Sequence, residues 1–247
     1  GVPYIYEILL KIGLKKDFFK LLKYTTVAGG YLSNSAKLSI IDFYDKLGIS
    51  LITMYGAAEA TSRMSFLPSE YSRKKNGSIG IPITNGCFFL EKENKEIIKN
   101  SHVNGELIYQ GENVCMGYAN SMIDLQENDI NNSVLKTGDI GYFDKDNFFY
   151  VVGKKNRYVK VVGNRISLDE MEKIIQAYGY KNICSQKTKD TITIHINEKN
   201  LQKPIKSYIS KYTSLHENLF KIVYLKSFPM TKNNKIDYNS EIFKYEN

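Results

Sequence analysis

The pattern that most constrains the fold is a strand, a helix and a second strand in close succession. Residues 24–28 are rich in β-branched and aromatic side chains, and residues 50–55 form a second apolar run that ends at a glycine. Between them, Ser33 can cap a helix over about residues 34–47, in which apolar side chains recur at helical spacing. This order predicts a βαβ unit with parallel strands, preceded by a short amphipathic helix over residues 16–23.

From about residue 77 the sequence changes character. Short apolar or alternating runs bounded by Gly and Asn predict antiparallel strands at residues 87–91, 105–110 and 147–152. Strands of this length and spacing can close into a small antiparallel barrel. Residues 1–152 are therefore predicted to combine an α/β part with an antiparallel part.

A second change near residue 153 indicates a compact α+β domain over residues 153–247. Residues 157–162 alternate as a strand, and Ser167 and Glu170 form a capping box before an amphipathic helix. A further helix and strand complete the domain, at about residues 203–213 and 219–225.

Within this domain, residues 190–197 alternate between apolar and polar side chains, as in a strand with one buried face. The alternation predicts that His195 lies on the solvent face. The side chains predicted to point inward are three isoleucines, Ile192, Ile194 and Ile196.

Composition limits the function classes. Hydrophobic residues make up 43% of the 247, which is enough for a core, and no run of about 18 apolar residues predicts a membrane span. The formal charge is +8, but the lysines are spread along the chain and mixed with acidic residues, so nucleic acid is not an expected partner. Three cysteines lie far apart without metal-ligand spacing and indicate reduced thiols in a cytoplasmic protein: Cys87, Cys115 and Cys184.

Four segments carry candidate chemistry. The first is residues 55–59, at the end of a predicted parallel strand, where the ligands of such sheets gather. Gly56 permits a tight turn, and Tyr55 offers a flat ring to a base. Glu59 puts a carboxylate where a metal–phosphate complex could sit. The alternative is an ordinary turn with a solvated carboxylate.

The second segment is residues 135–139. Asp139 follows a Thr-Gly pair in a loop, where its carboxylate can accept hydrogen bonds from both vicinal hydroxyls of a ribose. A common turn is the alternative.

The third and fourth segments are basic. In residues 153–165 a glycine, basic residues, a strand and a second glycine lead to Arg165, just before the capped helix; the alternative is a solvated basic face. The fourth is Lys235, which follows two Asn residues that tolerate a left-handed turn. A lone lysine in a loop is otherwise solvated surface.

In this order and at these distances, the four segments resemble the adenylate-forming, AMP-binding superfamily. That superfamily includes acyl- and aryl-CoA synthetases, luciferases and peptide-synthetase adenylation domains. The resemblance runs from about residue 24 to residue 237. Further short motifs support it, namely Ala28-Gly29-Gly30, residues 77–82, residues 105–107, Gly111 and Gly117-Tyr118.

The resemblance implies an ATP-dependent enzyme that activates a small carboxylic acid as acyl-AMP with Mg²⁺ and transfers the acyl group to the thiol of CoA. It also implies that the chain is the C-terminal half of such an enzyme. Residues 1–152 would be the C-terminal part of a large AMP-binding domain, and residues 153–247 a complete, small and mobile C-terminal domain.

The resemblance also assigns roles to single residues. Tyr55 would lie against the adenine, and Gly56 would also belong to the nucleotide-binding residues. Glu59 would be a catalytic residue and Mg²⁺ ligand, and Asp139 would accept hydrogen bonds from the ribose hydroxyls. A cation between the acid and the α-phosphate would neutralise the repulsion of two anions. The small-domain roles are the ribose contact Lys154, the hinge Asn156, the phosphate contact Arg165 and the catalytic cation Lys235.

Four positions depart from the family's pattern. Ala58 stands where the family usually has Thr, and Lys154 where it has Arg, so a hydroxyl and a bidentate guanidinium are lost. Asn156 replaces the common hinge Asp or Lys, and Asn234 replaces the Gly before the catalytic Lys. Both Asn residues still suit a turn.

The family's Ser/Thr/Gly-rich phosphate loop is not found before residue 55. The chain is therefore expected to begin within the large domain and not to adenylate an acid efficiently by itself. The leading interpretation is an acid–CoA ligase. Two alternatives stay open: an enzyme that loads an amino or acyl acid onto a carrier-protein thiol, and a catalytically inactive member of the fold. The sequence does not predict which acid is bound.

Overall fold

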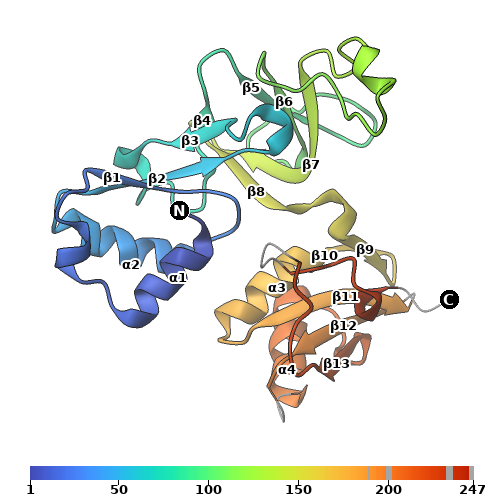
Figure 1. The fold of residues 1–247 in the computed structure, drawn as a ribbon. Helices are drawn as coiled ribbons and strands as arrows, with labels where there is room; N and C mark the ends of the chain where they lie inside the picture. The colour runs from blue at the N-terminus through green and yellow to red at the C-terminus, as the bar shows by residue number, and fades with distance from the viewer. Residues whose placement is uncertain (189, 199–201, 232–235, 245–247) are drawn as a thin grey trace. The chain divides into compact units, whose positions relative to one another are not determined.

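The computed structural model describes residues 1–188, 190–198, 202–231 and 236–244. The chain divides into two compact units, Gly1–Val151 and Val152–Asn247. Each unit has its own sheets and its own core (Figure 1). In the described ranges, none of the helices combines the length and the apolar character needed to cross a membrane.

The first sheet of the Gly1–Val151 unit contains the predicted parallel pair. Strand β1 (Tyr24–Val27) pairs in parallel with β2 (Ser50–Tyr55), and the helix between them is α2 (Asn34–Asp45). Ser33 caps α2, since its Oγ accepts a hydrogen bond of 3.2 Å from the Ala36 amide. The sheet continues antiparallel through β3 (Ser65–Leu67) and β4 (Ile81–Pro82), in the order β1-β2-β3-β4.

Two helical features differ from the prediction. The expected helix over residues 16–23 is only a 3₁₀ helix, η1 (Lys16–Phe19). Phe19 is buried, but Leu21 is 96% exposed, so no continuous apolar face holds a longer helix against the core. Helix α1 (Pro3–Ile12), which begins at a proline suited to the first turn, was not predicted. Its Tyr6 side chain is buried in the core with α2 and β2.

The second sheet of this unit has the order β5-β6-β7-β8, and β5–β6 and β6–β7 are antiparallel. It corresponds to the predicted antiparallel part of residues 1–152. The ten-residue strand β7 was not predicted, because a Thr-Gly-Asp sequence interrupts its apolar run. The four strands are β5 (Cys87–Glu91), β6 (Gly105–Gln110), β7 (Val134–Phe143) and β8 (Phe149–Lys154).

The Val152–Asn247 unit has the predicted α+β composition. A hairpin leads into a helix capped by Ser167, whose Oγ accepts a 3.2 Å hydrogen bond from the Glu170 amide. A three-stranded sheet of order β11-β12-β13 follows, with β11 antiparallel and β13 parallel to the central strand. The elements are β9 (Tyr158–Val161), β10 (Asn164–Ser167), α3 (Leu168–Ala177), β11 (Asn182–Thr188), β12 (Thr191–Ile196), α4 (Gln202–Thr213) and β13 (Phe220–Tyr224).

Strand β12 is buried on both faces, so the prediction that His195 faces solvent is wrong. The inward direction of Ile192, Ile194 and Ile196 is confirmed, and these side chains pack against α3 and α4. On the opposite face His195 is 1% exposed, because its ring packs edge-on against Phe243 near the C-terminus. Alternation in a single strand reveals one buried face but not a cover over the other.

The remaining helical segments are short 3₁₀ turns. They are η2 (Ala58–Ala60), η3 (Ser69–Tyr71), η4 (Asp124–Gln126), η5 (Lys155–Arg157), η6 (Glu217–Leu219) and η7 (Glu241–Phe243).

Candidate functional site

The first part of the site is the turn that follows β2. The chain reverses after Tyr55, and the turn is closed by hydrogen bonds from the Ser62 amide to the Ala57 carbonyl (3.0 Å) and from the Met64 amide to the Tyr55 carbonyl (2.9 Å). Gly56 is needed here, since a Cβ at this position would lie 2.3 Å from the Ser62 carbonyl oxygen. The turn therefore has a fixed backbone, which carries Glu59 in η2.

The second part is a bulge in β7. Glu106 of β6 pairs with Ile140 of β7, and Ile108 pairs with Lys136. An advance of two residues along β6 is therefore matched by four residues along β7. Thr137 closes the bulge, because its Oγ1 donates to the Leu107 carbonyl (2.7 Å) and accepts from the Asp139 amide (3.0 Å). A bulge re-aims the side chains next to it, and here it positions the carboxylate of Asp139.

These two parts meet. The Tyr55 hydroxyl donates a hydrogen bond of 2.5 Å to Oδ2 of Asp139, across 84 positions of sequence. The Asp139 residue is only 6% exposed. Burial of the phenol and the negative charge of Asp139 both raise the pKa of Tyr55, so the phenol stays protonated. The structure thus brings together the aromatic ring and the carboxylate that the sequence proposed for one nucleotide.

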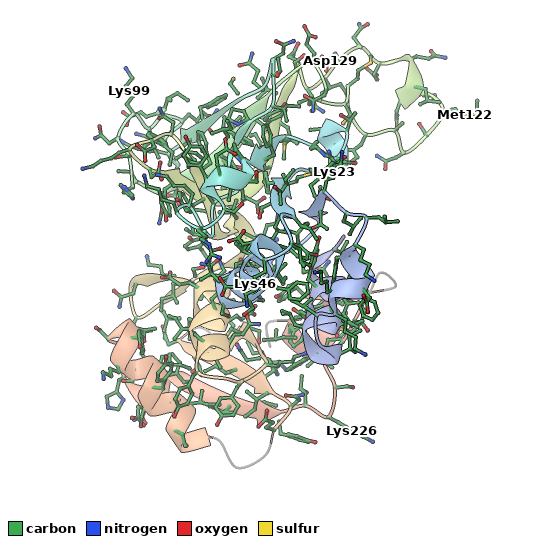
Figure 2. The ribbon with its side chains drawn as sticks, turned by 90° about the vertical axis from the view of Figure 1, so that its left-hand side faces the viewer. Lys23, Lys46, Lys99, Met122, Asp129 and Lys226 are labelled. Atoms are coloured by element: carbon green, nitrogen blue, oxygen red, sulfur yellow. The ribbon has the colours of Figure 1, made fainter. Side chains whose placement is uncertain are left out.

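A loop after β6 holds the turn that carries Glu59. The Cys115 amide donates to the Glu59 carbonyl (2.7 Å), and the Tyr118 hydroxyl donates to Oε1 of the Glu59 carboxylate. The hydrogen bond to Glu59 raises the pKa of the exposed Tyr118 phenol. Beyond Tyr118 the same loop continues through Met122 and Asp129, which are labelled in Figure 2.

Asn113 fixes the base of this loop. Its Nδ2 donates to the Ala60 carbonyl (2.8 Å) and the Arg63 carbonyl (3.0 Å), and its Oδ1 accepts from the Tyr109 hydroxyl (2.9 Å). No signal in the sequence singled out Asn113. Tyr118 was noticed only as part of a resembling motif, and its contact with Glu59 was not predicted.

The other predicted site residues belong to the Val152–Asn247 unit. The Lys154 amide donates to Oδ2 of Asp169 (2.7 Å) at the start of α3, and Asn156 is exposed in η5. Arg165 lies in β10, where its backbone is paired with Lys160. Lys235 falls outside the described residues.

The described residues contain no group of three or more His, Cys, Asp or Glu side chains that could hold a metal ion. All three cysteines are free thiols.

Comparisons with known proteins find similar sequences and folds. Residues 1–119 match the family model described as AMP-binding enzyme. The chain is 31% identical over 143 residues to a 2-succinylbenzoate–CoA ligase of Bacillus licheniformis, an alignment that covers 58% of this chain and 29% of that protein. A 2-succinylbenzoate–CoA ligase of Bacillus cereus is 30% identical over 131 residues, which cover 53% of this chain and 27% of the relative.

Solved structures share the fold over the whole chain. The O-succinylbenzoate coenzyme A synthetase of Bacillus subtilis in complex with AMP matches with a TM-score of 0.77 and 20% identity, covering 100% of this chain and 50% of that chain. The anthranilate CoA ligase AuaEII in complex with anthranoyl-AMP matches with a TM-score of 0.68 and 17% identity, covering 96% and 47%.

The chain thus spans about half the length of these structures, and its alignments cover less than a third of the curated relatives. The family match covers β2, the Glu59 turn and the loop with Tyr118. The fold match extends through the Asp139 bulge and the second unit. Residues 1–119 are therefore similar to AMP-binding enzymes, and the chain shares its fold with part of the solved O-succinylbenzoate coenzyme A synthetase.

Proposed function

We propose that this chain carries nucleotide-binding parts of an ATP-dependent acid–thiol ligase. Such an enzyme activates a carboxylic acid as acyl-AMP and transfers the acyl group to CoA. The observation that carries the proposal is the hydrogen bond between Tyr55 and Asp139 beside the Glu59 turn.

The pair suits a nucleoside for a chemical reason. The vicinal hydroxyls of a ribose can both donate to one carboxylate, and hydrogen bonds to a charged acceptor are the stronger kind. In the structure the Tyr55 hydroxyl donates to this carboxylate. A bound ribose would replace that donor at Asp139, and the Tyr55 ring would lie against the base.

Glu59 would hold Mg²⁺ together with phosphate oxygens of ATP, because Mg²⁺ is usually bound by one or two carboxylates plus substrate phosphates. The ion, when bound, would neutralise phosphate charge. The Tyr118 hydroxyl donates to the same carboxylate and would set its orientation.

Basic residues of the second unit are proposed to act in the same reaction. In the first step a carboxylate oxygen of the acid attacks the α-phosphorus, and the bond from that phosphorus to pyrophosphate breaks. Lys235 would lie between the two anions, Arg165 would contact the phosphates and Lys154 the ribose. In the second step the CoA sulfur attacks the acyl carbonyl carbon and AMP leaves. Asn156 would be the hinge between the steps.

We further propose an aromatic carboxylic acid as the substrate. The curated relatives are named for 2-succinylbenzoate, and one structural relative was solved with anthranoyl-AMP. The same names favour CoA over a carrier protein as the acceptor.

Calorimetric titration of this chain tests the proposal. We expect AMP to bind, and a non-hydrolysable 2-succinylbenzoyl-adenylate analogue to bind more tightly than AMP. Asp139→Asn should weaken both by about 10-fold or more, since a hydrogen bond to a charged group is worth about 1.5–3 kcal/mol. Asp17→Asn, whose side chain is 78% exposed in the same unit, is the matched control. Equal binding by Asp139→Asn and the parent chain would refute the assignment of the ribose site.

A further inference from the structure

A short stretch of backbone joins the two sheets of the Gly1–Val151 unit. Gly80, just before β4, forms an antiparallel bridge with Phe149, the first residue of β8. The Phe149 amide donates to the Gly80 carbonyl (3.0 Å), and the Ile79 amide donates to the Phe149 carbonyl (2.8 Å). The Ser78 hydroxyl also donates to the Phe149 carbonyl (2.7 Å). We call residues 78–80 and residue 149 the sheet joint.

The sheet joint lies on the structural path between Tyr55 and Asp139. On one side, Tyr55 pairs with Ser65 of β3, and the Ser65 hydroxyl donates to the Ile79 carbonyl (2.7 Å). On the other side, Phe149 begins β8, which is the neighbour of β7, the strand that carries Asp139. The position of Tyr55 relative to Asp139 therefore depends on how the two sheets meet.

Lys75 lies three residues before the sheet joint and contacts the turn between β7 and β8. Its Nζ donates to Oδ2 of Asp144 (2.7 Å) and to Oδ2 of Asp146, and it lies 5.0 Å from the centroid of the Phe148 ring. The side chains of Lys75 and Asp144 are each only 11% exposed. An ammonium held by two carboxylates over an aromatic ring ties the chain before β4 to this turn.

The Asp144 carboxylate also fixes the turn itself. Its Oδ1 accepts hydrogen bonds from the Asp146 amide (2.9 Å) and the Phe148 amide (3.0 Å), and its Oδ2 accepts from the Tyr150 hydroxyl (3.2 Å). Burial by itself would raise the pKa of Asp144, but the hydrogen bonds from Lys75 and the backbone amides outweigh burial and lower that pKa. The carboxylate is therefore ionised at neutral pH, and removal of Lys75 would leave a buried charge without its cation.

We propose that Lys75 is a positioning residue, whose ion pair with Asp144 holds the sheet joint together. The joint in turn keeps Tyr55 beside the Asp139 carboxylate, so that the ring and the carboxylate can meet one nucleoside. The link to nucleotide binding rests on the proposed function, whereas the link between the ion pair and the joint does not. Apolar side chains of similar volume could stabilise the fold as well. Directional contacts to two carboxylates instead specify one arrangement of the two segments.

Hydrogen–deuterium exchange of the whole chain tests the link between the ion pair and the joint. Lys75→Met removes the charge and keeps the apolar stem, and Lys75→Arg keeps the charge. We expect Lys75→Met to accelerate exchange of peptides that contain the Ile79 or Phe149 amide by about 10-fold, the factor for one hydrogen bond to a charged group. Lys75→Arg should restore much of the protection.

Lys92→Met is the matched control, because the ion pair of Lys92 with Glu96 in the same unit is exposed, and it should leave the joint unchanged. If Lys75→Met also accelerates exchange in α2, the milder Asp144→Asn decides, since Lys75 then keeps Asp146 as a partner. Unchanged exchange at the joint in the deciding variant would overturn the proposal.

The ratio of the affinities for AMP and 2′-deoxy-AMP tests the positioning role, because the fraction of folded protein cancels in this ratio. In the parent chain we expect AMP to bind about 10-fold more tightly. The ratio should fall toward one in the deciding variant of the exchange experiment and stay at the parent value in Lys92→Met. A parent-like ratio in a variant with accelerated exchange at the joint would overturn the positioning role.

Failure of the proposed function has a different signature. If the parent chain itself binds AMP and 2′-deoxy-AMP equally, the ribose site at Asp139 is refuted, and the positioning role is refuted with it. The exchange experiment would still decide whether Lys75 holds the sheet joint, since it uses no nucleotide.

Discussion

The Tyr55 hydroxyl donates to Oδ2 of Asp139, the carboxylate that we assign to the ribose. The phenol and a ribose hydroxyl are therefore competitors for one acceptor. Tyr55→Phe keeps the ring and removes the competitor, so we expect it to tighten AMP binding by up to about 10-fold, the factor for one such hydrogen bond. Calorimetry with AMP and with 2′-deoxy-AMP measures the effect.

The deoxynucleotide is the internal control, because it has only one of the two vicinal hydroxyls. The gain in Tyr55→Phe should be smaller for 2′-deoxy-AMP. Weaker binding of both ligands would mean that the phenol contacts the nucleotide rather than competing with it.

We expect the Tyr118 hydroxyl to affect ATP binding only when Mg²⁺ is present. Tyr118→Phe removes the donor to Glu59, and groups that orient a ligating side chain typically change metal affinity by about 10-fold or more. We expect the Mg²⁺-dependent part of ATP binding to fall by about this factor, with binding in EDTA unaltered. Tyr4→Phe, at a 58% exposed tyrosine of the same unit, serves for comparison. Equal losses with and without Mg²⁺ would point to a direct nucleotide contact.

Asn113 should contribute to stability. Asn113→Ala removes the acceptor of the Tyr109 hydroxyl and leaves the Ala60 carbonyl with only the 3.4 Å hydrogen bond from the Arg63 amide, and both Tyr109 and Ala60 are fully buried. We expect a loss of about 2–3 kcal/mol in the free energy of unfolding, measured by urea denaturation. Asn120→Ala, at an exposed position farther along the loop, should stay within about 0.5 kcal/mol of the parent. A small effect of Asn113→Ala would mean that water replaces the amide.

Alanine substitutions at Gly80 and Gly48 measure separately the stability cost of a steric clash and the cost of a positive φ. Both have positive φ, of 86° and 66°, but a Cβ at Gly80 would lie 1.9 Å from the Phe66 carbonyl, while nothing lies within 4 Å of one at Gly48. Gly48→Ala should cost about 1 kcal/mol. Gly80→Ala should cost more than about 4 kcal/mol, which thermal unfolding would report as a large drop in Tm. Similar costs would show that β3 and β4 move apart easily.

His195 should make the second unit sensitive to mild acid. Burial lowers its pKa to about 4 in the folded chain, while an unfolded histidine titrates near 6.5. As the pH falls, the unfolded chain therefore binds the proton before the folded chain does. The free energy of unfolding is highest above pH 6.5 and falls by at most about 3 kcal/mol as the pH drops from 6.5 toward 4. Urea unfolding at pH 7.5, 6 and 5 measures it. His195→Gln removes this titration, so the two chains should differ in slope; parallel slopes would contradict the assignment.

The helices around residues 34–47 and 168–178 and the parallel strand pair could be predicted because neighbouring residues in the sequence specify them. Ser33 and Ser167 each precede a helix with apolar side chains at helical spacing, and both cap it as expected. The parallel pair β1–β2 followed from the strand–helix–strand order. His195 was misplaced because the side chain that covers it, Phe243, is distant in sequence.

Candidate site residues were easier to propose than their contacts. Tyr55 and Asp139 each stand in a short recognisable motif, but the hydrogen bond between them depends on how two sheets pack. No sequence signal pointed to the buried guanidinium of Arg157, because its partners Asp169, Glu172 and the Cys184 carbonyl lie 12 to 27 positions away in sequence. The roles of Arg165 and Lys235 remain predictions.

The bulge in β7 makes chain length, rather than residue type, the strictest requirement near Asp139. Side chains of a strand alternate between its two faces, so deleting one residue between Lys136 and Asp139 would turn Asp139 away from Tyr55 and shift the pairing of everything up to Phe143. Libraries that vary this strand should accept substitutions at Lys136, which is its exposed residue. They should reject nearly every insertion and deletion between Lys136 and Asp139, because a change of length there would misplace the Asp139 carboxylate even though the residue itself is kept.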